Sequence, residues 1–312
     1  MGSLAGMRRV RYYEHGGPEV LTVEQADDPV PGQGELTVRP ESIGVTLPAV
    51  RMVRDPTSTL PGVLGGEVAG EVVAIGEGVT GFAVGDRVVS LPFTGSYADL
   101  VVVPAVMTTH IPQGSSASQA VALVRSGHVA LAALTVAAVA KDESVLVTAA
   151  AGGVGHLAVQ LAKLHGVPRV VAAVGDLAKG DFLRELGADE VVRYGDDVEV
   201  DVVLDGAGGE LLGTALKAVR PGGRLVFFNS GGGTINASEL LGGAKTVTGM
   251  AIRHFAAAHR DLYDKHHELL WELAGDGRLR PAIHAELPLA DAAEAHRIIE
   301  TRQNLGKVVL RP

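Results

Sequence analysis

The feature that most constrains this sequence is a β-strand followed at once by a glycine-rich turn and a helix. The strand is Ser144–Thr148, and the turn Ala149–Gly155 leads into an amphipathic helix, Gly155–His165. Parallel α/β folds bind dinucleotides at such turns, because small residues there allow a tight turn and let the backbone approach the pyrophosphate. The free N–H groups at the N-terminus of the following helix also attract phosphate. We therefore predict that this turn binds a nicotinamide dinucleotide.

The turn follows the dinucleotide fingerprint with one substitution. Gly152 and Gly155 occupy its second and third glycine places, where the backbone approaches the phosphates and the helix packs on the strand. Ala150 occupies the first place. The predicted cofactor contacts within the turn are Ala150, Gly152, Gly153, Val154 and Gly155.

The end of the next strand indicates which cofactor is used. An acid there would bind the ribose 2′-hydroxyl of NADH, but Gly175 stands at that position and Lys179 follows one turn later, which favours NADPH over NADH. Asp176 argues the other way, because a carboxylate repels a 2′-phosphate, unless it only caps the following helix. The predicted set is completed by Tyr194, Asn229 and Ser230, which end later strands.

The pattern of expected strands and helices divides the chain into two regions. After residue 143, strands alternate with helices, which predicts a Rossmann-type, doubly wound parallel sheet. The first third consists of short strands separated by turns, which predicts an antiparallel sheet or barrel. The last strand, Lys307–Leu310, has no partner nearby, so we expect it to return to the N-terminal sheet. The predicted domains are residues 1–116 with 256–312, and residues 117–255.

Composition excludes several classes of function. The sequence contains no cysteine, so disulfides, thiolate metal sites and cysteine nucleophiles are absent. The formal net charge is −9 without a basic cluster, which argues against a nucleic-acid partner. The apolar stretch Ala117–Ala140 contains Arg125 and His128, so we predict a buried helix capped by Ser115 or Ser116 rather than a membrane span. We expect a soluble cytoplasmic protein without a membrane partner.

Short motifs in a fixed order extend along nearly the whole chain. They are Gly16–Leu21, Gly65–Val72, Gly85–Val88, Ala149–Gly155 with Ala158–Lys163, Glu185–Asp189, Asp205–Gly208, Pro221–Arg224 and Gly306–Leu310. In these motifs the chain resembles the zinc-independent medium-chain dehydrogenases/reductases of the quinone oxidoreductase (zeta-crystallin-like) branch. The resemblance implies a GroES-like β-barrel, completed by the C-terminal tail, beside a Rossmann domain. It also implies a cleft between the domains and a homodimer formed edge to edge through Thr246–Met250.

The metal ligands of the zinc-dependent relatives are missing. By this resemblance, Thr46 stands at a cysteine position and Gly66 at the histidine position, and only Glu67 remains of that constellation. We therefore predict no metal site.

The substrate half departs further from the pattern. The segment Gly44–Ala49 lacks the usual Asn and Asp, and Val129 replaces a threonine that often lies near the nicotinamide. Thr46 and Ser126 are the candidate hydrogen-bond donors, or else ordinary capping and core hydroxyls. The predicted substrate residues are Thr46, Ser126 and Val129, and the catalytic proton donor is left unassigned.

Without a metal to polarise a carbonyl, hydride transfer to an electron-poor acceptor is the easier reaction. We predict an NADPH-dependent reductase of a small quinone or α,β-unsaturated carbonyl compound. Two alternatives remain open: an enoyl-thioester reductase or tailoring enzyme of a biosynthetic pathway, and a non-catalytic NADPH-binding protein.

Overall fold

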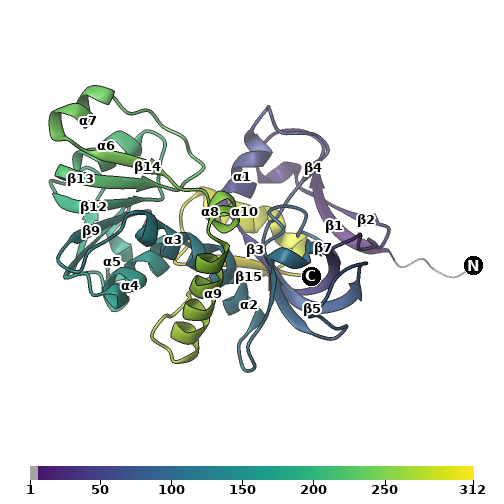
Figure 1. Ribbon diagram of the computed structural model, residues 1–312. Helices are drawn as coiled ribbons and strands as arrows, with labels where there is room; N and C mark the ends of the chain where they lie inside the picture. The colour runs from purple at the N-terminus through teal and green to yellow at the C-terminus, as the bar shows by residue number, and fades with distance from the viewer. Residues whose placement is uncertain (1–5) are drawn as a thin grey trace, which may run out of the picture. The chain divides into compact units, whose positions relative to one another are not determined.

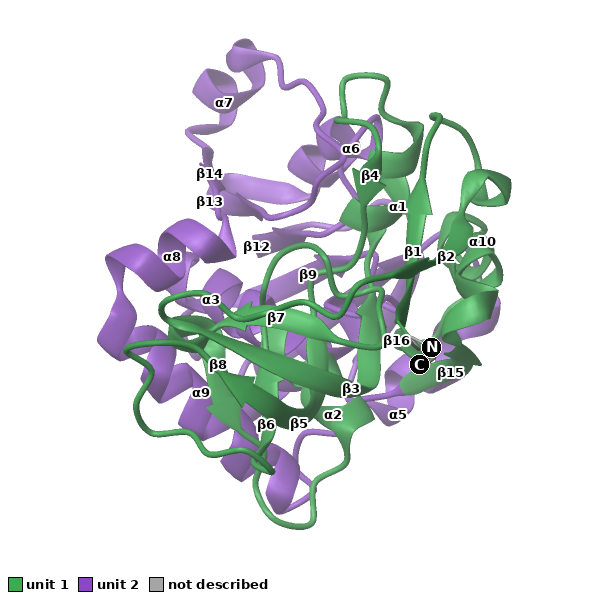
Figure 2. Ribbon diagram, turned by 90° about the vertical axis from the view of Figure 1, so that its right-hand side faces the viewer, with its two compact units in different colours: residues 1–125, 283–312 green, residues 126–282 purple. Residues whose placement is uncertain are grey.

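The computed structural model describes residues 6–312, which form two compact units. Among the described residues, unit 1 comprises residues 6–125 and 283–312, and unit 2 comprises residues 126–282 (Figure 2). The boundaries differ from the predicted ones on both sides. Helix α2 (Ala117–Ala122) packs on strands β3 and β5 of unit 1, and helix α9 (Arg260–Gly275) packs on α3 (His128–Val136) of unit 2. The boundaries of the units therefore follow from which elements these helices pack against, and not from the change in sequence pattern.

Unit 2 is built on a six-stranded parallel sheet with the order β11-β10-β9-β12-β13-β14. Branched residues fill its central strands, which are buried on both faces as a parallel sheet requires. Helices α4 and α5 lie on one side of the sheet and α6 and α7 on the other (Figure 1). The strands are β9 (Ser144–Thr148), β10 (Arg169–Val174), β11 (Glu190–Arg193), β12 (Val200–Asp205), β13 (Val219–Phe227) and β14 (Thr246–Gly249). The predicted doubly wound sheet is confirmed.

The remaining helices of unit 2 follow the predicted alternation closely. They are α4 (Gly155–His165), α5 (Gly180–Glu185), α6 (Leu211–Lys217), α7 (Ala237–Gly243) and α8 (Ile252–Ala258). Strand order reverses between β9 and β12, since the chain leaves β9 toward β10 and β11 and returns to β12. Ligands of such sheets bind at the carboxyl ends of the strands beside this switch point.

Unit 1 is built on two sheets whose strands pair antiparallel, except for β15 and β16, which pair parallel. The larger sheet has seven strands, with the spatial order β15-β16-β3-β5-β6-β8 and with β7 paired to β3. The smaller sheet has the order β2-β1-β4. The strands are β1 (Met7–Tyr12), β2 (Thr22–Ala26), β3 (Glu35–Val45), β4 (Gly62–Val63), β5 (Val68–Ile75), β6 (Arg87–Ser90), β7 (Val101–Pro104), β8 (Thr108–His110), β15 (Ile283–Pro288) and β16 (Lys307–Arg311). Strand β16 pairs antiparallel with β3, so the C-terminal strand does return to the N-terminal sheet.

The apolar segment is helical from Ala117 to Val136, but it is not one regular α-helix. Ser116 caps α2 with a full capping box to Gln119, and a π-helical turn, Leu123–Gly127, separates α2 from α3. The stretch Ala117–Val136 is long and apolar enough to cross a membrane by length and composition. However, 72% of its most apolar window is buried inside the protein.

Candidate functional site

The glycine turn of unit 2 brings helix α4 into close contact with the end of β9. A Cβ on Gly155 would lie 2.3 Å from the carbonyl oxygen of Ala149 and 2.6 Å from the Cα of Ala150. Only glycine therefore fits at this third place without movement of the backbone. Ala150 is fully buried, and its N–H donates to the carbonyl of Ala173 on β10. We call the turn Ala149–Gly155 with the N-terminus of α4 the cradle, and the missing side chain at Gly155 is what lets it pack closely on the end of β9.

A histidine that the sequence did not single out holds this turn in place. His156 is completely buried, and its Nε2 accepts the N–H of Ala282 at 3.0 Å. The other ring nitrogen, Nδ1, must then carry the proton, and it donates to the carbonyl of Gly152 at 2.8 Å. An imidazole in the first turn of a helix has no distinctive sequence pattern, so this role emerges only from the fold.

Two of the predicted cofactor residues, Gly175 and Tyr194, meet at the carboxyl edge of the sheet. The Oη of Tyr194, directly after β11, accepts the N–H of Ala149 at 3.2 Å. The same ring lies 3.6 Å from the position of a Cβ on Gly175. Lys179 is half-buried in the short helix Leu177–Lys179 that begins there. Asp176 caps this helix by accepting the N–H of Ala178 at 2.9 Å, which is the structural role considered for it.

A buried carboxylate ties the central strand ends together. Asp205, at the end of β12, accepts hydrogen bonds from Thr148 Oγ1 at 2.6 Å and from the side-chain amide of Asn229 at 2.9 Å. Burial raises the pKa of Asp205, while the bonds from Thr148, Ala207, Gly208 and Asn229 oppose that rise. The Asn229 side-chain oxygen also accepts the N–H of Gly231. Its side chain therefore orders the loop after β13, on which Ser230 is exposed.

Unit 1 contains a buried cluster of opposite charges. The Glu67 side chain is fully buried, with the guanidinium Nε of Arg125 2.8 Å from one carboxylate oxygen and the ammonium of Lys307 paired with the other. Burial lowers the pKa of Lys307, and the Glu67 carboxylate opposes this shift. Burial, with a contribution from Glu67, raises the pKa of the nearby Tyr97.

The positions that hold metal in zinc-dependent relatives are occupied differently. Thr46 begins helix α1 (Leu47–Arg54), and its hydroxyl accepts the N–H of Ala49 at 3.3 Å. A Cβ on Gly66 would lie 2.7 Å from Nη2 of Arg125. Neither residue offers a nitrogen, sulfur or carboxylate ligand, and residues 6–312 contain no group of three or more His, Asp or Glu side chains that could hold a metal ion.

The three predicted substrate residues are all buried, and they belong to different units. Thr46 lies in unit 1 as a helix cap. Ser126 lies in the π-helical turn and Val129 in α3, both in unit 2. Their contact with a substrate stays a prediction.

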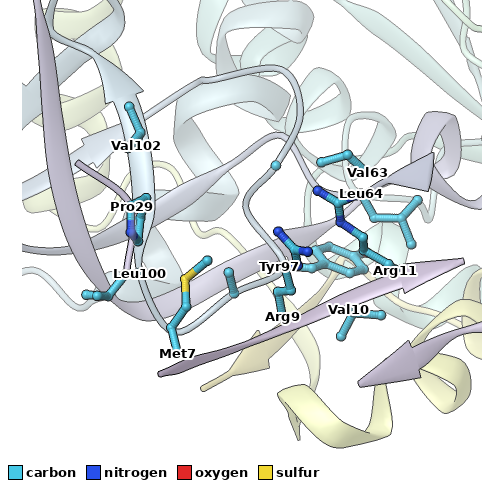
Figure 3. Close-up of a pocket in the computed structure, with 12 residues that line it drawn as sticks. Met7, Arg9, Val10, Arg11, Pro29, Val63, Leu64, Tyr97, Leu100 and Val102 are labelled. Carbon is cyan, nitrogen blue, oxygen red and sulfur yellow. The ribbon is translucent and has the colours of Figure 1, made fainter. Parts of the chain in front are cut away.

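Two pockets are present, and neither is lined by Thr46, Ser126 or Val129. In unit 1, a pocket of about 220 Å³ is lined by β1 and by Tyr97, with Arg9 and Arg11 at its wall (Figure 3). Both arginines approach Glu24, Arg9 at 2.7 Å and Arg11 at 3.9 Å. In unit 2, a pocket of about 240 Å³ lies against the sheet beside Tyr194.

Two family models match segments of the chain. Residues 32–113 match the alcohol dehydrogenase GroES-like domain, and residues 186–310 match the zinc-binding dehydrogenase family. The chain is 32% identical to the quinone oxidoreductase of Pseudomonas aeruginosa over 98% of its own length and 99% of the relative's. The chain belongs to the quinone oxidoreductase family. The predicted resemblance is confirmed.

The chain is also similar to proteins with other names. A 2-haloacrylate reductase from Burkholderia sp is 30% identical, with 96% of this chain and 97% of the relative covered. A polyketide synthase of Streptomyces halstedii is 34% identical over 89% of this chain, which corresponds to 5% of that protein.

Solved structures agree with the fold. The Escherichia coli quinone oxidoreductase complexed with NADPH has a TM-score of 0.91 at 29% identity, covering 98% of this chain and 100% of that one. A mycobacterial protein complexed with NADPH has a TM-score of 0.92 at 32% identity and the same coverage. The predicted combination of a Rossmann sheet and a GroES-like domain is thus confirmed.

Proposed function

We propose that this protein reduces a quinone or an α,β-unsaturated carbonyl compound, with NADPH as the hydride donor. The observation that carries this proposal is the cradle at the carboxyl edge of the unit 2 sheet, where the Gly155 turn, Tyr194 and Gly175 meet. Relatives of the same family crystallised with NADPH support the choice of cofactor.

The residues present fit a bound dinucleotide. Backbone N–H groups at the start of α4 would face the pyrophosphate, since no side chain from Gly152, Gly153 or Gly155 stands in the way. Tyr194 would flank the adenosine half, and Lys179 would supply the positive charge that a 2′-phosphate needs. When bound, NADPH supplies the hydride, and the protein's part is to orient the two reactants and exclude water.

We propose that the reaction proceeds without zinc. The support is chemical, because the chain has no cysteine and carries Thr46 and Gly66 at the metal-binding positions. An electron-poor acceptor suits such a site, since its own conjugated oxygen takes up the incoming charge.

The enoyl-thioester alternative has one observation in its favour, the similarity to a segment of a polyketide synthase. To separate the candidates, consumption of NADPH and NADH is followed spectrophotometrically with quinones, enones and enoyl thioesters. Turnover of quinones or enones supports the proposal, and turnover of enoyl thioesters alone would replace it. Binding of NADPH without turnover of any acceptor would favour a non-catalytic role.

The choice of NADPH is tested at Lys179. Charge reversal in Lys179→Glu should weaken NADPH binding by roughly 10- to 100-fold, about 1.4 to 3 kcal/mol, and leave NADH binding nearly unchanged. Calorimetric titration of both cofactors measures this. Lys141→Glu, at an exposed residue, makes the same change of charge and is the control. Equal losses for NADPH and NADH would remove the argument from the 2′-phosphate.

We further propose that the protein acts in the cytoplasm as a homodimer. A chain without cysteine suits a reducing compartment. Strand β14 ends the sheet order of unit 2, so it has an edge available for pairing with a second copy.

A further inference from the structure

We propose that the guanidinium of Arg125 binds the acceptor oxygen that becomes negatively charged during reduction, and so stabilises that charge. The inference deepens the proposed function and depends on it for the identity of the acceptor. It is carried by the geometry around Arg125 within unit 1.

The charged cluster is open on the side of Arg125. Glu67 is fully buried, and the side chain of Lys307 is 4% exposed, but that of Arg125 is 17% exposed. Glu67 therefore holds two cations, of which only one reaches the surface of the unit. An arginine that a carboxylate holds in place and that is partly exposed can donate hydrogen bonds to a further anionic oxygen.

Arg125 also has donors to spare. Its Nε faces Glu67, and its Nη2 donates to the carbonyl of Gly66 at 3.3 Å. A guanidinium carries five N–H groups, which is more than the contacts with Glu67 and Gly66 require.

Irregular backbone on two segments places the guanidinium. Arg125 lies in the π-helical turn Leu123–Gly127. Such turns are rare in proteins overall, but those that occur are frequently at functional sites. Below the guanidinium, 5.4 Å from its central carbon, lies the ring of Phe93. Phe93 has a φ of 69°, a left-handed conformation that a bulky residue adopts only under constraint.

Two glycines provide the space. A Cβ on Gly44 would lie 2.0 Å from a carboxylate oxygen of Glu67, and one on Gly66 would lie 2.7 Å from Nη2 of Arg125. A histidine at position 66, as in the zinc-dependent relatives, would displace the guanidinium. Arg125 thus lies beside position 66, where the zinc-dependent relatives have a metal ligand. Its guanidinium supplies a positive charge there in place of a metal ion.

The chemistry requires such a charge. A hydride added to the β-carbon of an enone displaces the electron pair of the C=C bond, and a carbon–oxygen π pair moves onto the carbonyl oxygen. A new double bond then joins the α-carbon to the carbonyl carbon, and water supplies the proton that completes reduction at the α-carbon. Arg125 would stabilise the oxyanion between these two events.

Binding of an oxyanion is tested without any cofactor. The probe is 4-nitrophenol, whose phenolate resembles an enolate and is detected by its visible absorbance. In the wild-type protein the bound probe should ionise at lower pH than the free probe. Arg125→Leu should abolish this shift and weaken phenolate binding at least about tenfold, while Arg125→Lys should retain part of both.

Turnover provides the second measurement. If Arg125 polarises the acceptor, Arg125→Leu should lower kcat for enones by about 100- to 1000-fold, as loss of one oxyanion donor does elsewhere, with NADPH binding unchanged. Arg87→Leu, which removes an exposed arginine paired with Glu41 in the same unit, is the matched control.

The two measurements separate failure of this inference from failure of the proposed function. An unchanged phenolate shift in Arg125→Leu would overturn the inference, even if the protein reduces enones. A lost shift without turnover of any acceptor would keep the anion site and overturn the reductase. Should Arg125→Leu not fold, Arg125→Gln and Arg125→Lys decide by the same titration, since a purely structural arginine predicts no change in the probe.

Discussion

At the scale of single residues, the dinucleotide turn depends on contacts that its glycines permit and on one imidazole that fixes it. His156 uses both ring nitrogens within unit 2, to Gly152 and to Ala282, and so links the turn to the segment after α9. The sequence identifies the glycines because their spacing is diagnostic. It does not identify His156, because a histidine on a helix acquires this role only from the residues that surround it.

Gly155 provides a test of the close packing. In Gly155→Ala the new methyl would meet backbone atoms of Ala149 and Ala150, so we expect a loss of about 1 to 3 kcal/mol in unfolding free energy and at least about tenfold weaker NADPH binding. Gly213→Ala, inside α6 where a Cβ meets nothing within 4 Å, should instead be neutral or stabilise by about 0.5 to 1 kcal/mol. Thermal unfolding and cofactor titration measure both. Wild-type NADPH affinity in Gly155→Ala would contradict the cradle.

His267 predicts a dependence of stability on pH. Burial lowers its pKa from 6.5 to about 4, and its Nε2 accepts the indole N–H of Trp271 at 2.9 Å. At a pH between the unfolded and the folded pKa of His267, this residue binds more protons in the unfolded chain than in the folded one. The unfolding free energy therefore falls as the pH drops from about 6.5 to 4. The full effect of this residue is about 3 kcal/mol.

Urea unfolding at pH 7, 6, 5 and 4 measures this loss, with the fluorescence of Trp271, the single tryptophan, as the signal. His267→Phe should be less sensitive to acid by about the stated amount. His254→Gln, at an exposed histidine, should behave as the wild type does. An identical pH slope in His267→Phe would exclude this residue as the origin.

At the scale of elements, helix α1 explains what Thr46 does within its own unit. The hydroxyl caps the helix, so Thr46→Ala should cost about 1 kcal/mol of stability and Thr46→Asn, which also caps, should restore most of it. Chemical denaturation measures the stability, and turnover is assayed alongside. A stable Thr46→Asn with low turnover would add the predicted substrate contact to the capping role, and full stability of Thr46→Ala would contradict the cap.

The elements of unit 2 were largely predictable, and those of unit 1 less so. Strand β9 and helix α4 have the predicted bounds, because apolar periodicity and glycine signals agree there. Residues 252–275 form two helices, α8 and α9, that break at His259. Helix α1 was not predicted, since Pro48 and the turn-like residues around it hide a short amphipathic helix.

The crossover from β11 to β12 shows how tertiary structure overrides a general pattern. Parallel strands are usually joined through a helix of a dozen or more residues, but here six residues, 194–199, connect them. The connection begins with a turn at Tyr194 and Gly195, and the pocket of about 240 Å³ lies beside Val192 and Leu211.

At the scale of the whole molecule, the free edge of β14 bears on the proposed dimer. The N–H of Met250 donates to Phe227 on β13, so alternation along the strand turns the N–H of Val247 toward the open edge. Val247→Pro removes that donor without removing a bond to β13, and we expect it to shift the protein from dimer to monomer. Light scattering after size-exclusion chromatography measures the mass.

Val247→Ala is the matched control, because it loses the side chain but retains the N–H group. We expect it to remain a dimer. A dimeric Val247→Pro would show that the copies pair through another surface, and a monomeric wild type would exclude the proposed assembly.

The sequence by itself determined the doubly wound sheet, the dinucleotide turn and the loss of the metal ligands, because each depends on local spacing or on the identity of a few residues. It also placed the last strand beside the N-terminal sheet, since an isolated strand must pair. Only the tertiary structure assembled Glu67, Arg125 and Lys307, which lie far apart in sequence and meet because β16 pairs with β3 and α2 packs on the same sheet. Charge clusters of this kind depend on long-range packing, and no local pattern encodes them.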